Sequence, residues 1–521
     1  MNRQCKAERA DIVIVGNGIA GLTAAVEARR LAPGASIAII TKQSHPTINT
    51  PALKQFAMGK LSQEQLLAYP AGTEWAQRIH VINAQVEAIN AQEKFVCLEG
   101  GFGFGYGTLL IATGSTANGL PANLPGRNFD GVLTLHCLQD YQDLRRRLGE
   151  VDDAVVIGGG AHAIETVTSL LHLGIQVHWL IRGKTFLSRM LDHPASEMVL
   201  DHIRQAGAKV YTDTSVVGIV GRVGSVVGVV TNANQMLPCQ LVLTCTGTKP
   251  VTRLAEHCNM PMGHMHGIFV DDQLRTSVCD IYAAGAAAAL KNPQTGAYET
   301  RPLWYASVLQ GRMAAAMMTG HHEVGAGKPG GLSPLAGALG VPWHATQLGE
   351  LRMLSVGHLQ DQAENAMIYT DSSKRNYRRL TVMGDRLVSY LSLGSTQPDS
   401  LAIKHIIDEG LSIRDITKDL LKGDFDARKY FSQQQSRAAR DLVTSGKLPA
   451  VNWVLSPAPP VRSLTISAPA LPSYVARHTD PSHLVSRNAW QMPAVVEAQP
   501  SSQGQPVRNG RKGQFVVIGK R

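Results

Sequence analysis

The clearest pattern in this chain is a short apolar run that ends at a glycine turn and leads into a helical repeat of apolar positions. It occurs at residues 11–15, with the helical repeat at 22–31, and again at 154–157, with the helical repeat at 166–173. A buried strand that passes through a tight turn into a helix begins a βαβ unit. The pattern therefore predicts two α/β units, each built on a parallel sheet.

Further apolar runs, separated by glycines and polar residues, extend both units. The strands that they predict lie at residues 36–41 and 108–112 in the first unit and at 177–181, 216–230 and 241–244 in the second. Alternating residues within 80–99 predict a small antiparallel insert in the first unit. Residues 280–285 predict a strand and Trp304 begins a helical pattern, so the chain is expected to return to the first unit.

The part of the chain after these units has a different pattern. Residues 321–335 are rich in glycine and proline, which predicts a linker. Residues 378–393 alternate around Gly384, as expected of a hairpin, and helical patterns follow at 399–409 and 413–421. We therefore expect a third unit, of the α+β class.

The C-terminal segment, residues 446–521, shows no sustained periodicity and contains ten of the 26 prolines. It holds nine Lys and Arg against two Asp and Glu, and therefore +7 of the formal net charge of +10. Such a segment cannot bury enough apolar surface to offset chain entropy, so a disordered tail is predicted. Because most of the net positive charge lies in this tail, the excess of basic residues does not indicate a nucleic-acid-binding surface on the folded units.

Composition narrows the class of protein further. Hydrophobic residues make up 44% of the 521 residues and charged residues 17%, as in ordinary globular proteins. No apolar run approaches the roughly 20 residues that a membrane span needs, and the first ten residues do not resemble a signal peptide. The seven cysteines are scattered, without a C-x-x-C pair, which argues against a disulfide framework or a metal site. We expect a cytoplasmic protein without a transmembrane segment.

Small residues in the two turns are the strongest candidates for a binding site. They are Gly16, Gly18 and Gly21 in the first turn, and Gly158, Gly160 and Ala163 in the second. Without a Cβ, backbone N–H groups at the start of a helix can approach a pyrophosphate closely. Two such turns predict two bound dinucleotides, and the usual chemistry of that pair is hydride transfer between a nicotinamide and a flavin. The alternative for either turn is a glycine-rich turn without a ligand.

Several motifs resemble the two-dinucleotide flavoprotein reductases, above all the branch of the rubredoxin and ferredoxin reductases and of the FAD domain of nitrite reductases. Besides the two turns, the motifs lie at residues 106–115, 244–250, 280–285 and 306–314, in the family's order. The resemblance implies an FAD-binding domain at 1–117 and 245–320, an NAD(P)-binding domain at 118–244 and a C-terminal α+β interface domain at 330–432. Interface domains of this family commonly support dimers, so a homodimer is the alternative to a monomer.

The resemblance also implies site residues beyond the two turns. For FAD they are Thr113, Gly114 and Gly285, and for the nicotinamide dinucleotide they are Glu165, Arg182 and Gly247. Glu165 corresponds to a family glutamate near the nicotinamide, and the alternative is a structural acid stabilised by the helix dipole. Arg182 ends the strand at 177–181, where an arginine favours the 2′-phosphate of NADP over the free hydroxyl of NAD. A solvated surface arginine is the alternative there.

Three departures from the family pattern concern the FAD site. Lys42 stands where the family has an acid for the adenosine ribose, Thr50 where it often has Arg or Lys, and Ala286 where Asp or Glu bonds the ribityl chain. A hydrogen bond to a charged group contributes about 1–3 kcal/mol, and about 1.4 kcal/mol is tenfold in affinity. The departures therefore predict weakened FAD binding without excluding it.

The resemblance implies an FAD-dependent NAD(P)H oxidoreductase, with NADPH favoured, that passes electrons to an external acceptor. An acidic electron-carrier protein would suit the basic tail, and a small molecule is the alternative acceptor. Residues 42–62 hold no cysteine, so the disulfide- and peroxide-reducing chemistry of related branches is not expected, and no catalytic side chain is identified. A degenerate nucleotide-binding or scaffold subunit is one alternative function. A membrane-bound quinone reductase is another, and it usually needs an amphipathic apolar anchor, for which the proline-rich tail is a poor candidate.

Overall fold

The computed structural model describes residues 8–263, 267–292, 295–321, 340–359, 365–373, 375–394 and 399–444, with side chains as far as 437. Contacts divide the chain into a large unit, Met1–Leu464, and a second one, Thr465–Arg521, which lies outside the described residues. The predicted linker, apart from His321, and the predicted tail also lie outside them.

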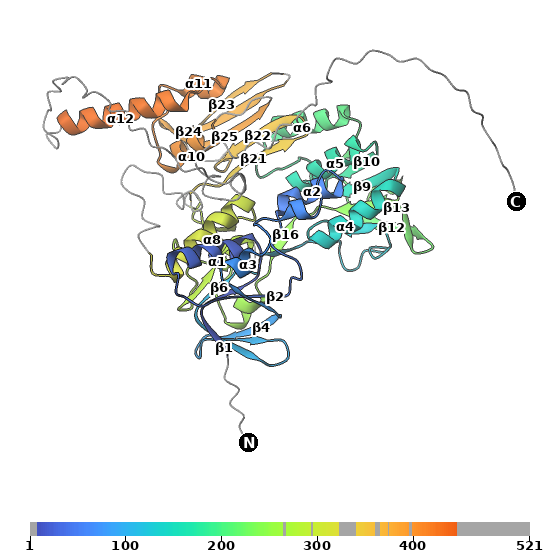
Figure 1. Ribbon diagram of the computed structural model, residues 1–521. Coiled ribbons are helices and arrows are strands. Elements are labelled where there is room, and N and C mark those ends of the chain that lie inside the picture. Colours follow the sequence, from blue (N-terminus) through green and yellow to red (C-terminus); the bar gives the residue numbers. More distant parts are fainter. Residues whose placement is uncertain are drawn as a thin grey trace, which may run out of the picture. The chain divides into compact units, whose positions relative to one another are not determined.

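The first nucleotide unit is built on a seven-stranded sheet with strand order β3-β2-β1-β6-β5-β4, and β18 pairs with β6 (Figure 1). Its parallel strands are β3 (His80–Asn83), β2 (Ile37–Thr41), β1 (Glu8–Val15), β6 (Gly103–Ile111) and β18 (Ile281–Ala283). The antiparallel strands are β4 (Val86–Asn90) and β5 (Phe95–Leu98). Parallel strands end at one edge of a sheet, so the turns after β1, β6 and β18 lie together.

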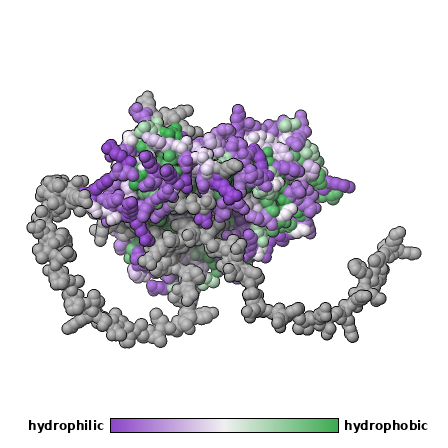
Figure 2. Space-filling model, turned by 90° about the horizontal axis from the view of Figure 1, so that it is seen from above, coloured by the Kyte–Doolittle hydropathy of each residue, from purple (hydrophilic) through white to green (hydrophobic). Residues whose placement is uncertain are grey.

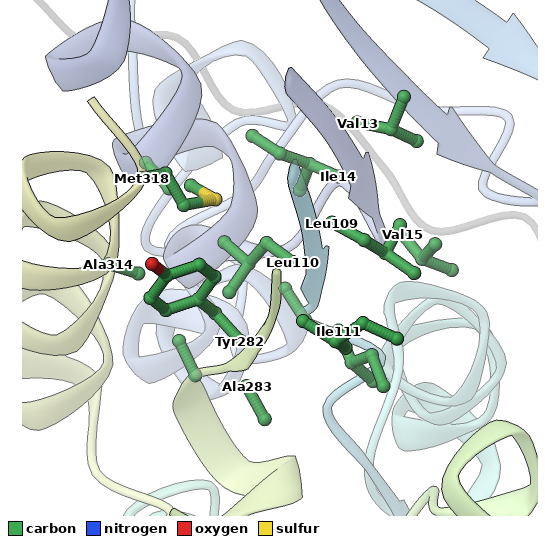
Figure 3. Packing of buried hydrophobic residues seen from close by; sticks show 14 of the residues in the cluster. Val13, Ile14, Val15, Leu109, Leu110, Ile111, Tyr282, Ala283, Ala314 and Met318 are labelled. Carbon is green, nitrogen blue, oxygen red and sulfur yellow. The ribbon is translucent and has the colours of Figure 1, made fainter. Parts of the chain in front are cut away.

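A hydrophobic core joins this sheet to two helices that are far apart in the sequence, α1 (Ile19–Leu31) and α8 (Trp304–Met318). The two helices pack directly against each other. Figure 3 shows Ala314 and Met318 of α8 close to Tyr282 of β18. A Cβ on Gly311 would lie 2.5 Å from the carbonyl oxygen of Ala20, so glycine permits the close helix contact.

The second nucleotide unit is built on a five-stranded parallel sheet with strand order β11-β10-β9-β15-β8. The strands are β8 (Val132–Thr134), β9 (Asp153–Ile157), β10 (Gln176–Leu180), β11 (Lys209–Tyr211) and β15 (Leu241–Thr244). The helices α4 (Leu138–Arg147), α5 (Ala161–His172) and α6 (His193–Gln205) share a hydrophobic core with this sheet. A small antiparallel sheet of β12 (Val216–Arg222), β13 (Ser225–Thr231) and β14 (Met236–Pro238) belongs to the same unit.

Short elements connect the two units and complete the first. Strand β16 (Thr248–Pro250) pairs antiparallel with β7 (Ser115–Ala117). The segment that follows β6 in the first unit therefore lies beside the segment that follows β15 in the second. Helix α7 (Arg253–His257) follows β16, and β17 (Ile268–Phe269), β19 (Ala288–Lys291) and β20 (Tyr298–Thr300) form a small sheet.

The C-terminal unit is a five-stranded antiparallel sheet with strand order β21-β22-β25-β24-β23. The strands are β21 (Trp343–Leu348), β22 (Leu351–Val356), β23 (Ala366–Ser372), β24 (Tyr377–Met383) and β25 (Arg386–Gly394). The helices that follow are α10 (Ser400–Asp408), α11 (Thr417–Lys422) and α12 (Ala427–Thr444). Apolar side chains of α10 and α11 form one core with the sheet, whereas Leu391 and Leu393 share a core with the second nucleotide unit.

Two local predictions differ from the structure. Residues 80–83 were expected in an antiparallel insert, but β3 pairs in parallel with β2, and only β4 and β5 are antiparallel. The second C-terminal helix begins at Thr417 rather than at residue 413. Alternation along a strand does not reveal the direction of its neighbour, which explains the first difference.

Hydrophilic residues cover much of the molecular face in Figure 2, where hydrophobic residues reach the surface in separate patches. Within the described ranges, no helix combines the length and the apolar character that a bilayer crossing requires.

Candidate functional site

The first glycine turn leads from β1 into α1 and leaves the helix start open. Gly16 has a φ of +110°, and a Cβ there would collide with a backbone carbonyl oxygen, as would a Cβ on Gly21. A Cβ on Gly18 would meet nothing within 4 Å. Gly18 is the N-cap of α1, and no side-chain hydrogen bond caps the helix. Packing therefore requires Gly16 and Gly21, whereas Gly18 leaves free N–H groups for an anion.

Three further predicted residues lie around the same turn. Gly285 has a φ of +75°, and a Cβ there would lie 3.0 Å from the Ala20 side chain on α1. The turn at Gly114 has a φ of +73° and open space where its Cβ would be. The Thr113 hydroxyl donates to the Val251 carbonyl oxygen at 2.6 Å, so Thr113 ties β6 to the segment after β16.

Asn17 is a buried polar residue inside the first turn that the motif did not single out. Its Nδ2 donates to Glu74 Oε1 at 3.1 Å, on the short helix α3 (Thr73–Ala76). The Thr47 hydroxyl donates to the Asn17 carbonyl oxygen at 2.8 Å. The partners are 57 and 30 positions away, so no local pattern could have indicated these bonds.

The three departures from the family pattern leave the FAD side of the site without the expected charges. Lys42, directly after β2, is exposed and forms no ion pair with the described residues. Thr50 opens the 3-10 helix η1 (Thr50–Ala52), and Ala286 lies partly buried in η4 (Gly285–Ala287). An FAD bound here would therefore depend on backbone groups more than is usual in the family.

The second glycine turn repeats the division of roles seen in the first. Gly158 has a φ of +143°, and a Cβ there would collide with the Cys245 carbonyl oxygen. Gly160 is the N-cap of α5 without a side-chain cap, and a Cβ there would meet nothing within 4 Å. Ala163 is fully buried, and Gly247, with a φ of +91°, follows β15 at the same edge of the sheet.

Three cations follow β10 next to the second turn. Arg182, Lys184 and Arg189 are exposed, and none has an ion pair or a side-chain hydrogen bond in the described part of the chain. The segment that carries them is held against the turn, because the Leu187 N–H donates to the Gly159 carbonyl oxygen at 3.0 Å. The second turn therefore has unpaired positive charge on the side where β10 ends.

An ion pair connects α5 to a helix that comes from the first half of the chain and packs on the core of the second nucleotide unit. Lys54 of α2 (Leu53–Ala57) pairs with Glu165 Oε2 of α5, and Thr346 of β21 donates to Glu165 Oε1 at 3.1 Å. Burial alone would raise the pKa of Glu165, but the Lys54 ammonium outweighs it and holds the pKa below the usual value. Glu165 is therefore ionised at neutral pH and joins all three folded units. Lys54 was missed as a site residue, because its partner is 111 positions away.

Two neutral side chains lie beside this ion pair. Tyr141 of α4 has its hydroxyl 3.3 Å from Nε2 of His162, in the first turn of α5. Burial, followed by the nearby Lys54 ammonium, lowers the pKa of His162 to about 4. Burial also raises the pKa of Tyr141 well above its ordinary value. Neither side chain is charged at neutral pH, so neither competes with Lys54 for Glu165.

Comparisons with known proteins assign the chain to a family. Residues 10–311 match the model of the pyridine nucleotide-disulphide oxidoreductases. The chain belongs to this family. Rubredoxin-NAD(+) reductase of Pseudomonas putida is 27% identical, over 59% of this chain and 80% of its own length. The biphenyl dioxygenase system ferredoxin–NAD(+) reductase component of Paraburkholderia xenovorans is 24% identical, over 78% of this chain and 98% of its own.

A solved structure agrees at the level of the fold. The ferredoxin reductase for the CYP199A2 system from Rhodopseudomonas palustris superimposes with a TM-score of 0.69 at 24% identity, covering 81% of this chain and 99% of that one. These comparisons confirm the predicted family, the α/β fold class and an oxidoreductase that uses FAD and a nicotinamide dinucleotide. The individual site residues and the domain limits stay predictions.

The residues present fit an FAD at the first turn. The open helix start at Gly18 suits a pyrophosphate. Gln310 is fully buried, and its Oε1 accepts from the Gly285 N–H at 2.7 Å, whereas its Nε2 has no partner among the described residues. A buried donor without a partner costs about 1–3 kcal/mol, so a bound group that accepts from Nε2 would remove this cost.

Proposed function

We propose that this chain is an NADPH-preferring reductase that passes hydride from the nicotinamide to FAD and electrons on to a small external carrier. The observation that carries the proposal is the ion pair of Lys54 and Glu165. It joins α2, which follows the first unit's β2 in the sequence and packs on α4, to Glu165 in the second turn of α5. The second dinucleotide would bind at the start of α5. The two cofactors would therefore meet at this junction.

The chain's own residues bind and orient the reactants. A bound FAD would supply the chemistry of hydride uptake and onward electron transfer. The open starts of α1 and α5 would hold the two pyrophosphates. Glu165 keeps the Lys54 ammonium in place, so that a cation stands at the junction where negative charge develops. Tyr141 and His162 form a neutral, partly buried wall beside this cation and limit the access of water.

The preference for NADPH rests on the unpaired cations after β10. A 2′-phosphate carries negative charge that an adjacent arginine can bind with two parallel hydrogen bonds. Arg182, Lys184 and Arg189 are free for this purpose in the described chain. The relatives named above are NAD(+) reductases, so this preference would set the chain apart from them.

The proposed acceptor is a small acidic iron–sulfur protein. The relatives carry rubredoxin and ferredoxin in their names, and the tail of this chain has a net charge of +7 that would attract an acidic carrier. A cytoplasmic location and a homodimer remain predictions alongside it.

Anaerobic titration of the full-length protein tests the function. Added FAD should bind, with quenched fluorescence and a changed visible spectrum, and NADPH should then bleach the flavin at a lower concentration than NADH. A protein that leaves the FAD spectrum and fluorescence unchanged at excess FAD would support the alternative of a scaffold subunit. Flavin that binds without being bleached by either coenzyme would also contradict hydride transfer.

A further inference from the structure

The carboxylate of Asp192 connects the second nucleotide unit to the C-terminal sheet. Asp192 is the N-cap of α6, and its Oδ1 accepts from the Ala195 N–H at 3.1 Å. Its Oδ2 accepts from the Tyr377 hydroxyl and lies 3.4 Å from Nε of Arg379, and both of these residues belong to β24. Tyr377 and Arg379 are each 3% exposed, so the carboxylate is bound by two buried side chains of another unit.

The face of the C-terminal sheet that carries these two side chains packs on the second nucleotide unit. Tyr377 and Arg379 are two positions apart on β24 and therefore point to the same side of the sheet. Their partners on the neighbouring strand β25 are Leu393 and Leu391, and both leucines share a hydrophobic core with the second nucleotide unit. The bonds to Asp192 therefore lie at a packed contact between the two units.

Asp192 also follows directly on the segment that carries the three unpaired cations after β10. This segment, residues 182–191, contains no helix or strand. Phe186 in its middle is fully buried, and the Phe186 N–H donates to Oγ of Ser196, in the first turn of α6, at 2.8 Å. A backbone bond to the second glycine turn holds its other side. The cations are therefore placed between the second glycine turn and the start of α6.

We propose that Tyr377 and Arg379 are positioning residues for the coenzyme. By holding Asp192 they fix the start of α6, and with it the direction in which the cations of residues 182–191 face a 2′-phosphate. The C-terminal unit thereby sets the affinity of a site to which it contributes no ligand. The proposal rests on the proposed preference for NADPH, because without a 2′-phosphate the cations would have no ligand to meet.

An ion pair is a weak way to hold two units together, but it defines a direction. The cost of removing a carboxylate and a guanidinium from water offsets much of their attraction, and apolar residues of similar volume often stabilise a contact equally well. Hydrogen bonds in fixed directions instead define one orientation, which the recognition of a phosphate by charged donors requires. The same sheet also holds Glu165 through Thr346, so β21 and β24 form bonds to α5 and α6 respectively.

A bond that only joins two units and a bond that positions the cations predict different results. Loosening the units would weaken every ligand of the second glycine turn to a similar degree. Misplacing the cations would weaken only the ligands that carry a 2′-phosphate. Adenosine 2′,5′-bisphosphate and 5′-AMP differ only in that phosphate, so the ratio of their dissociation constants isolates its contribution.

Calorimetric titration of the full-length protein, with FAD added to fill the first turn, measures both dissociation constants. Tyr377→Phe removes only the hydroxyl, and Asp192→Asn keeps a helix-capping oxygen but loses the ion pair. Each should weaken adenosine 2′,5′-bisphosphate about fivefold or more, as expected for the partial loss of a charge-assisted hydrogen bond, and leave 5′-AMP unchanged. Tyr305→Phe is the matched control, because the Tyr305 hydroxyl donates to the Trp343 carbonyl oxygen at 2.9 Å and ties the C-terminal unit to α8 instead. It should bind both nucleotides like the wild type.

Stopped-flow reduction of bound FAD gives a second readout. In Tyr377→Phe and Asp192→Asn, the NADPH concentration at half-maximal rate should rise, and the limiting rate should stay the same. A wild type that binds both nucleotides equally well would contradict the NADPH preference itself, and the positioning role with it. A wild type that prefers the bisphosphate, with the same preference in both variants or with an equal loss for both nucleotides, would overturn the positioning role alone.

Discussion

At the scale of single residues, the glycines of the two turns divide into those that the fold requires and those that a ligand requires. A side chain on Gly21 would collide with the Gly16 carbonyl oxygen, but a side chain on Gly18, with its φ of −80°, would stand in open space. Gly18→Val should therefore fold with a melting temperature near that of the wild type and fail to bind FAD. Gly21→Val is the control and should lower the melting temperature strongly. Retained flavin in Gly18→Val would show that the turn does not hold the cofactor.

Ala286 is the residue at which the FAD site can be strengthened. It lies partly buried directly after Gly285, where the family has a carboxylate for the ribityl chain. Ala286→Asp should tighten FAD binding about tenfold or more, since a hydrogen bond to a charged group contributes about 1.5–3 kcal/mol. Fluorescence titration measures the dissociation constant, and Ala286→Asn should gain less. Unchanged or weaker binding by the aspartate would mean that FAD lies elsewhere.

Arg182 decides the proposed coenzyme preference. Its guanidinium is exposed and unpaired beside the second turn, so replacing it should leave the fold unchanged. Arg182→Glu should repel a 2′-phosphate and accept a free 2′-hydroxyl, and NADH should then reduce the flavin at a lower concentration than NADPH. Arg222→Glu, at the end of β12, is a charge-matched control. The same order of coenzymes in both variants would identify Arg182 as a surface charge.

At the scale of elements, the first turn of α5 predicts a pH dependence of stability. The pKa of His162 falls from an ordinary 6.5 to about 4 in the folded chain, because burial disfavours the imidazolium. As the pH drops below 6.5, the unfolded chain takes up a proton that the folded chain refuses, so stability is lost down to about pH 4. At pH 5 the loss from this group is about 2 kcal/mol.

His162→Gln removes this titration and should lose about 2 kcal/mol less stability than the wild type between pH 7 and pH 5. Chemical denaturation at the two pH values measures the difference. His172→Gln, at the exposed end of the same helix, should behave like the wild type. If His162→Gln and wild type lose the same stability, His162 is not held neutral by burial.

The elements also show what the sequence could and could not predict. The turns at Gly16 and Gly158 were predictable because the strand, the glycine and the helix follow one another directly in the chain, so the pattern can be read within one short stretch of sequence. The pairing of Lys54 with Glu165 was not, because it follows from how three units pack. Strands β21 to β23 were missed as well. Nearly every residue of β23 is exposed, so it has no alternation of apolar and polar positions to reveal it.

At the scale of the whole molecule, the charge is divided between the folded units and the C-terminal segment. The formal net charge is +10, and residues 446–521 hold +7 of it, so the remainder of the chain is close to neutral. A basic tether raises the rate of association with an acidic partner, and salt screens the effect within a Debye length of about 8–10 Å. The role of this segment can therefore be separated from the fold by truncation.

A chain that ends at Ser445 should keep its melting temperature and both nucleotide sites, because the segment's composition cannot bury enough apolar surface to stabilise the fold. It should lose the salt-sensitive part of its binding to an acidic electron carrier. Pull-down of such a carrier at low and high salt, by full-length and truncated protein, measures this loss, and melting curves check the fold. A chain with the nine cations of the segment changed to Gln is the matched control for length, and it should bind like the truncated form. A large fall in melting temperature on truncation would mean that the segment packs on the folded units, and equal binding at both salt concentrations would make it a passive linker.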